Sequence, residues 1–295
     1  MIQVLSNTPI RVQNFEFTQS MDCVGTKISF HTPEFLPVSA PLQVFLHGKL
    51  FFTGKVEARS FSFSTKSREG QYGGRDLLTI RLDTCPHPKS YAKGVSFSHL
   101  MKDLCPDVPF EVRGSLPPLP AFSIDPGETL LEILQTAGKK VGASVFVSNG
   151  KLTLAKELRK TAVSFGPHSD ILSLEVEENV SKIFDELIYL EGKPEAGKDP
   201  QKKIRRKKVL TLSEKKEKTD GTKEKVRQKN CAAIRDSFSC TISCSEAKGL
   251  EPYDLVSVHL PDFQVSGEFV VSDVRYSLSQ EEERMCVTLR KPDGF

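Results

Sequence analysis

The segment Lys55-Val-Glu-Ala-Arg-Ser-Phe-Ser-Phe63 decides the fold class of this chain. Phe61 and Phe63 lie two residues apart, and serines occupy the positions before and between them. Because successive side chains of a β-strand point to opposite faces, this alternation predicts a half-buried strand. Directly upstream, Gly48-Lys-Leu-Phe-Phe-Thr-Gly54 predicts a tight turn that leads into the strand.

Further strands are predicted on both sides of this segment. Residues Gly25–Phe30 alternate, Leu42–Leu46 is an apolar run of strand length, and Leu77–Leu82 follows a polar loop that contains glycines. Short strands separated by turns with glycine favour a small barrel or sandwich. We therefore predict a first β-barrel domain over residues 1–88.

Residues 89–165 predict a compact α+β domain. A short helix is expected over Ser98–Leu104, and Asn149-Gly150 predicts the turn of a β-hairpin. Between them, apolar residues recur at steps of three and four, which is typical of an amphipathic helix. They are Leu130, Ile133, Leu134, Ala137 and Val141, and Gly142 is a natural stop.

Residues 166–295 predict a second β-barrel domain, interrupted by a basic insertion at 193–229. The expected strands are Ile171–Val176, Ile183–Leu190, Phe238–Cys244, Leu255–Leu260, Gly267–Leu278 and Arg284–Leu289. The predicted fold class is mainly β with an α+β middle module: two related small β-barrels flank a small α+β domain.

The two β portions resemble each other in sequence. Pro41–Gly54 corresponds to Pro252–Gly267, and Leu78-Thr-Ile-Arg-Leu82 corresponds to Val287-Thr-Leu-Arg290. Any two antiparallel meanders share some features, so coincidence is one interpretation. The agreement in order favours an internal duplication.

The positive charge is concentrated in one segment. The chain has a net charge of +3, yet residues 193–229 carry fifteen Lys and Arg against six Asp and Glu. Such runs commonly form a solvated insertion, which is the favoured interpretation. A contact with DNA or with an acidic partner surface is the alternative. The residues concerned are Lys202, Lys203, Arg205, Arg206, Lys207 and Lys208.

No catalytic, cofactor-binding or metal-binding pattern emerges. The segment Gly48–Val56 is not a phosphate-binding loop, because five residues separate its glycines and Val stands where Ser or Thr is needed. Cys240 and Cys244 lie on one face of a predicted strand and are expected to be small buried hydrophobes. Seven cysteines without regular spacing favour folding in a reducing compartment. We predict no cofactor and a protein that is not an enzyme.

One short segment supports a rival hypothesis. Asp125-Pro-Gly-Glu-Thr-Leu and the helix that follows it resemble LysM, a peptidoglycan-binding module, over Asp125–Gly142. A cell-wall-binding module is therefore the alternative function.

A broader resemblance covers nearly the whole chain. The matching pieces are Thr53-Gly-Lys-Val-Glu57, Gly74-Arg75-Asp76, Leu82-Asp-Thr-Cys85, Phe122-Ser-Ile124, Gly150-Lys-Leu-Thr-Leu154, Pro252-Tyr-Asp-Leu-Val256, Gly267-Glu-Phe-Val-Val-Ser-Asp-Val274 and Val287-Thr-Leu-Arg-Lys-Pro292. In this order, the chain resembles the baseplate hub family of Mu-like and related contractile-tailed phages (tail protein D/P type, late control D-like). Gly54, Gly74, Arg75, Asp76 and Gly267 are the expected structural turn motifs. The basic insertion departs from the family pattern.

The resemblance implies a structural part of a virion tail baseplate, assembled in the cytoplasm of the bacterial host. It implies a homotrimeric ring that joins the tail tube to the central spike, with baseplate wedge proteins as further partners and tape-measure protein or DNA passing through the channel. A secretion apparatus or a tailocin uses the same kind of part. The sequence has no secretory signal at residues 1–20 and no apolar run near the roughly 20 residues that a membrane helix needs.

Overall fold

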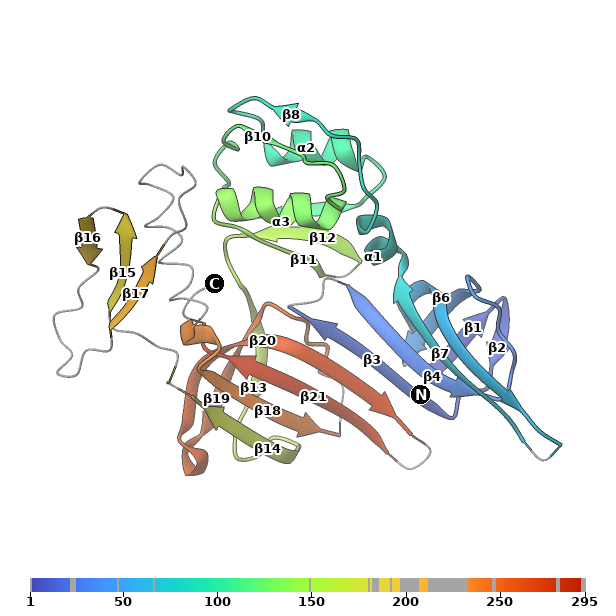
Figure 1. Cartoon of the computed structure of the whole chain (residues 1–295). Helices are drawn as coiled ribbons and strands as arrows, with labels where there is room; N and C mark the ends of the chain where they lie inside the picture. The colour runs from blue at the N-terminus through green and yellow to red at the C-terminus, as the bar shows by residue number, and fades with distance from the viewer. Residues whose placement is uncertain are drawn as a thin grey trace.

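The computed structural model describes residues 2–21, 25–46, 48–65, 67–148, 150–179, 181, 186–191, 193–196, 207–211, 233–245, 248–279 and 282–292. The chain is mainly β, as predicted, with a smaller helical module above a large sheet (Figure 1). No helix in this described part is long and apolar enough to cross a bilayer.

The N-terminal β unit holds the strands from the first part of the chain. They are β1 (Ile2–Ser6), β2 (Thr8–Ile10), β3 (Asn14–Ser20), β4 (Thr26–Thr32), β5 (Pro41–Leu46), β6 (Lys49–Phe63) and β7 (Arg68–Asp76). Their pairing order is β3-β4-β7-β6-β5-β1-β2. Alternating burial along β4 and β5 puts Ile28, Phe30, Leu42 and Val44 in the core, because one face of each strand packs inward.

The C-terminal β unit repeats this strand order. Its elements are β13 (Arg159–Phe165), β14 (Ile171–Glu178), β18 (Phe238–Cys244), β19 (Asp254–Leu260), the 3-10 turn η2 (Pro261–Phe263), β20 (Val265–Leu278) and β21 (Glu283–Arg290). They pair as β14-β18-β21-β20-β19-β13, which matches β3-β4-β7-β6-β5-β1 strand for strand. One connection differs: β1 is antiparallel to β5, whereas β13 is parallel to β19. The internal echo in the sequence therefore corresponds to two units of one topology.

A β-bulge fixes which residues correspond between the units. The register of β6 against β7 shifts between Val56 and Ala58, and that of β20 against β21 shifts between Val271 and Asp273. A bulge adds one unpaired residue to a strand, so the two bulges mark equivalent points. Ala58 is thus the counterpart of Asp273, and β7 is the counterpart of β21.

This register shows that one of the correspondences expected between the two β portions of the sequence is wrong. Leu77–Leu82 was predicted to be a strand equivalent to Val287–Arg290, but it forms the short helix α1 (Leu77–Leu82). Asp76 precedes it in an extended conformation and its carboxylate accepts a hydrogen bond from the backbone N–H of Thr79. This N-cap starts the helix despite an apolar run that suits a strand.

The two units share one continuous 13-stranded sheet, since β20 pairs with β3. Phe17 and Tyr276 stack at this junction with ring centroids 5.4 Å apart. One hydrophobic core runs beneath both units. Among the described strands no pairing closes either unit into a barrel, so barrel closure stays a prediction.

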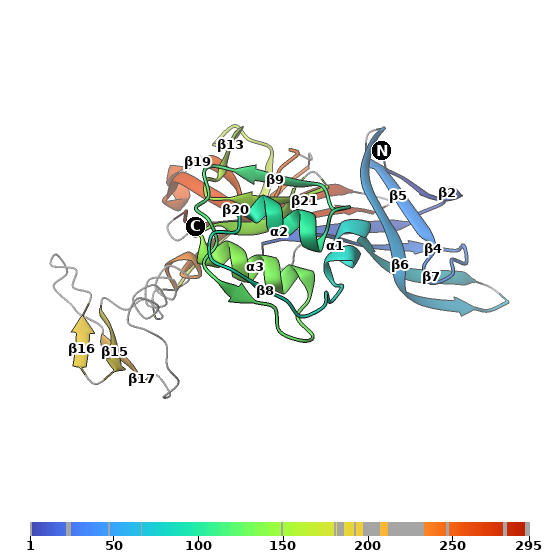
Figure 2. The ribbon, with the colours of Figure 1, turned by 90° about the horizontal axis from the view of Figure 1, so that it is seen from above.

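The middle module has its own core and lies above the sheet, on the side from which the molecule is viewed in Figure 2. Its elements are β8 (Ser90–Tyr91), α2 (Phe97–Leu104), β9 (Phe110–Arg113), β10 (Phe122–Ser123), α3 (Leu130–Lys140), β11 (Ser144–Ser148) and β12 (Lys151–Ala155). The predicted helix α3 is confirmed: Thr129 and Glu132 form a capping box, and its apolar stripe is buried. The β11–β12 hairpin is confirmed as well.

A separate three-stranded sheet precedes and enters the basic insertion. It comprises β15 (Glu186–Glu191), β16 (Lys193–Ala196) and β17 (Lys207–Thr211), in the order β16-β15-β17. Parts of the insertion therefore have regular backbone structure.

Candidate functional site

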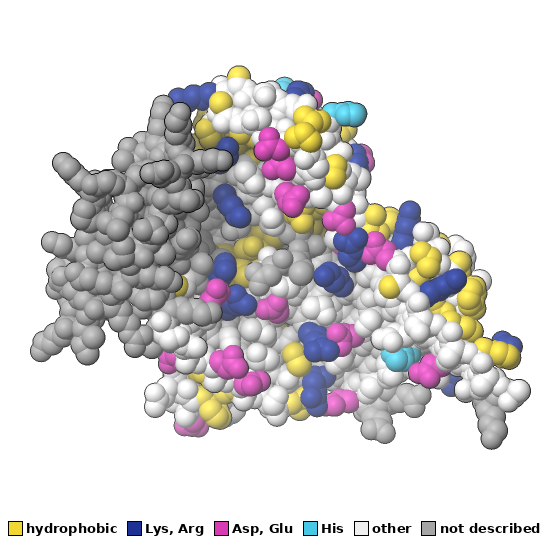
Figure 3. Space-filling view, viewed as in Figure 1, with side chains coloured by type: hydrophobic (Ala, Val, Ile, Leu, Met, Phe, Trp, Pro, Cys, Tyr) yellow, Lys and Arg dark blue, Asp and Glu magenta, His cyan; other side chains and the backbone are white. Residues whose placement is uncertain are grey.

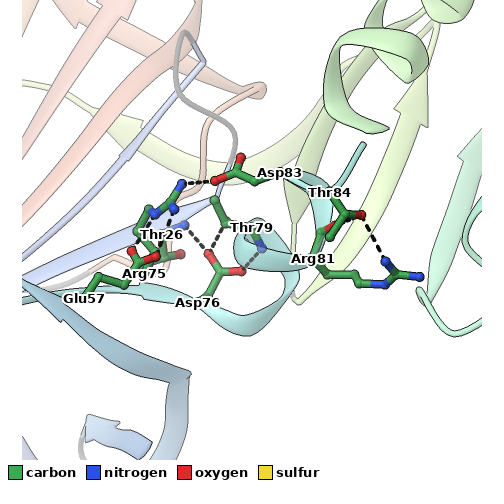
Figure 4. A network of polar contacts seen from close by, with 8 residues as sticks. All are labelled: Thr26, Glu57, Arg75, Asp76, Thr79, Arg81, Asp83 and Thr84. Carbon is green, nitrogen blue, oxygen red and sulfur yellow. Dashed lines mark hydrogen bonds and ion pairs between the residues drawn. The ribbon is translucent and has the colours of Figure 1, made fainter. Parts of the chain in front are cut away.

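The link between the N-terminal β unit and the middle module is organised by one carboxylate (Figure 4). Oδ1 of Asp76 accepts a hydrogen bond from the backbone N–H of Thr79 at 2.7 Å, and Oδ2 accepts one from the Thr79 hydroxyl at 2.6 Å. Oδ2 also accepts the backbone N–H of Thr26 at 2.6 Å. A single side chain thus ties β7, the start of α1 and the start of β4 together.

Arg75 completes this link, which we call the Asp76 joint. Its guanidinium donates to both oxygens of Glu57, at 2.6 and 2.9 Å, and to Oδ2 of Asp83 at 2.6 Å. The hydrogen bonds to Arg75 hold the pKa of the Glu57 carboxyl below its usual range. The same hydrogen bonds raise the pKa of Arg75. Arg75 therefore fixes the residue that follows α1 against β6.

Two glycines allow the strands beside this joint to lie close together. A Cβ added to Gly54 would lie 2.2 Å from the carbonyl oxygen of Arg75, and one added to Gly74 would lie 2.5 Å from that of Lys55. Both glycines lie inside strands and not in turns, which corrects the prediction; Gly267 likewise lies inside β20. Gly54 and Gly74 are needed because no larger residue fits between β6 and β7.

A second joint lies where the chain leaves the middle module and enters the C-terminal β unit. Arg159 at the start of β13 donates two hydrogen bonds to Asp254 at the start of β19, at 2.6 and 2.5 Å. The Asp254 side chain is only 3% exposed, and it also accepts the backbone N–H of Glu251 at 2.9 Å. Next to this Asp254 joint, Tyr253 stacks on Phe146 of the module with ring centroids 4.1 Å apart.

A cavity of about 660 Å³ lies where the three parts of the chain meet. Leu50 and Phe51 line it from β6, Leu77 from α1, Val108 and Val147 from the module, and Glu251 from the C-terminal unit. Arg81 and Asp107, which also line it, form an ion pair at 3.1 Å. Its wall mixes these apolar side chains with the carboxylates of Asp76, Asp107 and Glu251.

The cysteine pair considered as a metal site is buried in the sheet core. Cys240 and Cys244 are fully buried, and burial raises the pKa of each thiol to about 11. The interpretation as small hydrophobes is confirmed for both. In the described part of the chain, no three His, Cys, Asp or Glu side chains gather where they could hold a metal ion.

The predicted site residues fall in different places. Arg75 and Asp76 meet in the Asp76 joint. Lys202, Lys203, Arg205 and Arg206 lie outside the described residues, and Lys207 and Lys208 begin β17. The reasoning from sequence missed Thr26, Thr79, Arg159 and Asp254. An Asp directly before an apolar run signals a helix start, which would have identified Asp76 as a cap.

The fold is that of phage-type tail proteins, so the resemblance read from the sequence is confirmed at the level of fold. The chain matches the 43 kDa tail protein of prophage MuSo2 from Shewanella oneidensis with a TM-score of 0.87, at 14% identity, over 99% of this chain and 98% of that one. It matches a tail protein from Neisseria meningitidis MC58 with a TM-score of 0.80, at 18% identity, over 99% and 96%.

A component of the type VI secretion system, the E. coli c3393 protein, also matches, with a TM-score of 0.61 at 9% identity over 98% of this chain and 76% of that one. Its description notes structural similarity to the T4 bacteriophage tail proteins gp27 and gp5. No protein-family model matches the chain, and no curated protein matches it in sequence.

Proposed function

We propose that this chain is a structural hub subunit of a contractile phage-type tail baseplate. In this proposal three copies form a ring that joins the tail tube to the central spike. The observation that carries it is the repeated strand order of the two β units. Three copies would present six units of one topology, which suits a six-fold tube on one side and a three-fold spike on the other.

The similarity to tail proteins along the whole chain supports a location in the virion tail. The tail spike, the tail tube and baseplate wedge proteins are the proposed partners, and assembly would take place in the host cytoplasm. The match to a type VI secretion component favours a second candidate, the same part in a related secretion apparatus. In either setting the proposed role is positional and not catalytic.

The mass in solution tests the ring. We expect a particle of roughly three times 32.8 kDa by light scattering and a ring with a central hole in electron micrographs. A monomer at high protein concentration, with no ring on isolated tails, would contradict the proposal.

We further propose that the basic cluster contacts a polyanion or an acidic partner. Replacing Lys202, Lys203, Arg205 and Arg206 with serine tests this without removing β17, which begins at Lys207. Binding to double-stranded DNA should weaken and its salt dependence should flatten, because fewer counterions are released. If the affinity for DNA and for tape-measure and tube proteins is unchanged, the proposed contact is contradicted. The segment is then interpreted as a solvated insertion.

A further inference from the structure

The junction inside the chain supplies a template for a junction between chains. The first half of β20 pairs with β19, and its second half, Asp273–Leu278, pairs with β3 of the other unit. Tyr276 stacks on Phe17 there, and Arg275 forms an ion pair with Glu16 at 2.6 Å. The long strand of the C-terminal unit is therefore shared between the two units.

The counterparts of both strands have an open edge. In β6 the first half pairs with β5, but Ala58–Phe63 pairs only with β7 among the described strands. Among the strands that the structure describes, β14, the counterpart of β3, likewise pairs with β18 alone and ends the sheet. The equivalent edges of β20 and β3 are covered, because these two strands pair with each other at the junction inside the chain.

The side chains on these edges are more exposed than their covered counterparts. Tyr276 and Phe17 at the internal junction are 1% and 6% exposed. Their counterparts are Phe61 on β6, which is half-buried, and Val176 on β14, which is 39% exposed. Phe63, on the same face of β6 as Phe61, is 67% exposed, whereas its counterpart Leu278 is half-buried. Apolar side chains on a long open strand edge are characteristic of a surface that pairs with another strand.

The bulge and the ladder set the register that a second junction would have. In the N-terminal unit Val56 pairs with Gly74, which in turn pairs with Ile28. In the C-terminal unit Val271 pairs with Leu289, which in turn pairs with Cys240. Ile28 and Cys240 are therefore equivalent. Phe17 is opposite Ile28 and Val176 is opposite Cys240, so Val176 is the counterpart of Phe17.

Transferring the β20–β3 register to β6 and β14 gives the cross-strand pairs. Phe61 lies opposite Val176, Phe63 opposite Leu174, and Arg59 opposite Glu178. The transferred register thus places apolar residues opposite apolar residues and an arginine opposite a glutamate. The two edges were identified by their exposure, so this match of charge is an independent observation.

Charge also selects the partner. The open edge strand β14 carries Glu175, Glu177 and Glu178, whereas the β6–β7 hairpin mixes Arg59 and Arg68 with Glu57 and Glu69. Two β14 strands would repel each other, whereas Arg59 offers β14 an opposite charge, so the β6 edge of a second copy is the better partner. In Figure 1 the two edges lie at opposite ends of the sheet, with β14 at the lower left and the β6–β7 hairpin at the lower right. Hydrophobic side chains are visible at both ends of that view (Figure 3).

We propose that β14 of one copy pairs with Ala58–Phe63 of β6 in the next copy, in antiparallel orientation and in the register of the internal β20–β3 junction. The contact is head-to-tail, because two different surfaces meet, and such contacts build closed rings when the rotation closes. This inference rests on the proposed ring and names the surface that closes it. The sheet of each copy would continue into the next.

A charge exchange tests the register. Arg59→Glu and Glu178→Arg should each shift the particle from the trimer mass to 32.8 kDa at micromolar protein, with at least a 100-fold weaker assembly constant. Their combination in one chain should restore the trimer, since every copy supplies both sides of the junction. Glu268→Lys, on the part of β20 that pairs with β19, is the control for net charge and should leave assembly unchanged.

Cross-linking gives an independent measurement. In the transferred register Ser62 lies opposite Glu175 on the other face, so Ser62→Cys with Glu175→Cys should form an inter-copy disulfide on mild oxidation. Ser62→Cys with Ser173→Cys, two residues out of register, should not. A wild-type trimer whose mass neither charge reversal alters, or that gives no in-register disulfide, would overturn the pairing and leave the ring intact. A wild-type monomer without a ring would overturn the proposed function itself.

Discussion

The two joints that hold the middle module use the same chemistry in different surroundings. Each pairs an arginine with a carboxylate at two oxygens. In the Asp254 joint the carboxylate is 3% exposed, whereas Glu57 in the Asp76 joint is 35% exposed. A buried pair depends on both partners being present, while a more exposed network spreads its contribution over several weaker bonds. We therefore expect a larger loss of stability from breaking the joint where the chain leaves the module than from breaking the one where it enters.

The largest effect is expected from Asp254→Ala. It removes both acceptors of Arg159 and the acceptor of the Glu251 N–H, and should lower the free energy of unfolding by about 3 kcal/mol in urea titrations. Glu268→Ala breaks the exposed pair of the neighbouring Lys160 and should cost less than about 0.5 kcal/mol. Equal effects of the two variants would contradict the larger contribution expected of the buried Asp254 carboxylate.

Gly54→Ala should come next. The added methyl group meets the Arg75 carbonyl, so β6 and β7 must separate beside the Asp76 joint, at a cost of about 2 kcal/mol. Gly166→Ala is the matched control, because its nearest atom, the carbonyl oxygen of His259, would be 3.9 Å from the new Cβ. Thermal unfolding of both variants at one protein concentration compares them.

Asp76→Ala should cost about 1.5 kcal/mol, since α1 loses its N-cap. Asp76→Asn keeps one acceptor oxygen of the two and should fall between the wild type and the alanine variant. Hydrogen exchange of the Thr79 and Thr26 amides reports the loss directly. If these amides stay protected in the alanine variant, the carboxylate does not organise the joint.

The smallest effect concerns pH. The pKa of Glu57 is lowered in the folded chain, chiefly by its hydrogen bonds to Arg75, so its contribution is complete above the ordinary value of 4.5 and is lost as pH falls through the lowered value. Glu57→Gln should therefore destabilise the chain by less than about 1 kcal/mol at pH 7. The difference from the wild type should shrink as pH falls below 4.5 and through the lowered pKa of Glu57. A difference that grows towards low pH would contradict this sign.

Local patterns in the sequence predict most of the fold. Alternation along Lys55–Phe63 and the stripe from Leu130 to Ala137 suffice for β6 and α3, because burial of one face determines both periods. The prediction for Leu77–Leu82 fails because five of its six residues are apolar or β-branched and suit a strand, and only the hydrogen bond of Asp76 to Thr79 decides for a helix.

The two joints and the residue-by-residue equivalence of the two β units could not be predicted from the sequence. Arg159 and Asp254 are 95 residues apart, and nothing local marks them as partners. The equivalence of the two β units depends on the bulges after Val56 and Val271, which no residue pattern announces. Gly54 and Gly74 do mark special positions, but glycine is needed there because two strands lie close together and not because the chain turns.

The β20–β3 pairing has a consequence for synthesis of the chain on the ribosome. Arg275 contacts Glu16 across 259 residues, so β3 emerges long before its partner strand exists. At ribosomal rates this interval lasts roughly 10 to 50 s, far longer than a hairpin needs to form. During it, β3 is a strand with an uncovered edge, and β20 of a neighbouring chain that has been synthesised but has not yet paired with its own β3 fits that edge equally well. Exchange of this strand between crowded nascent chains is thus the characteristic misassembly of this fold.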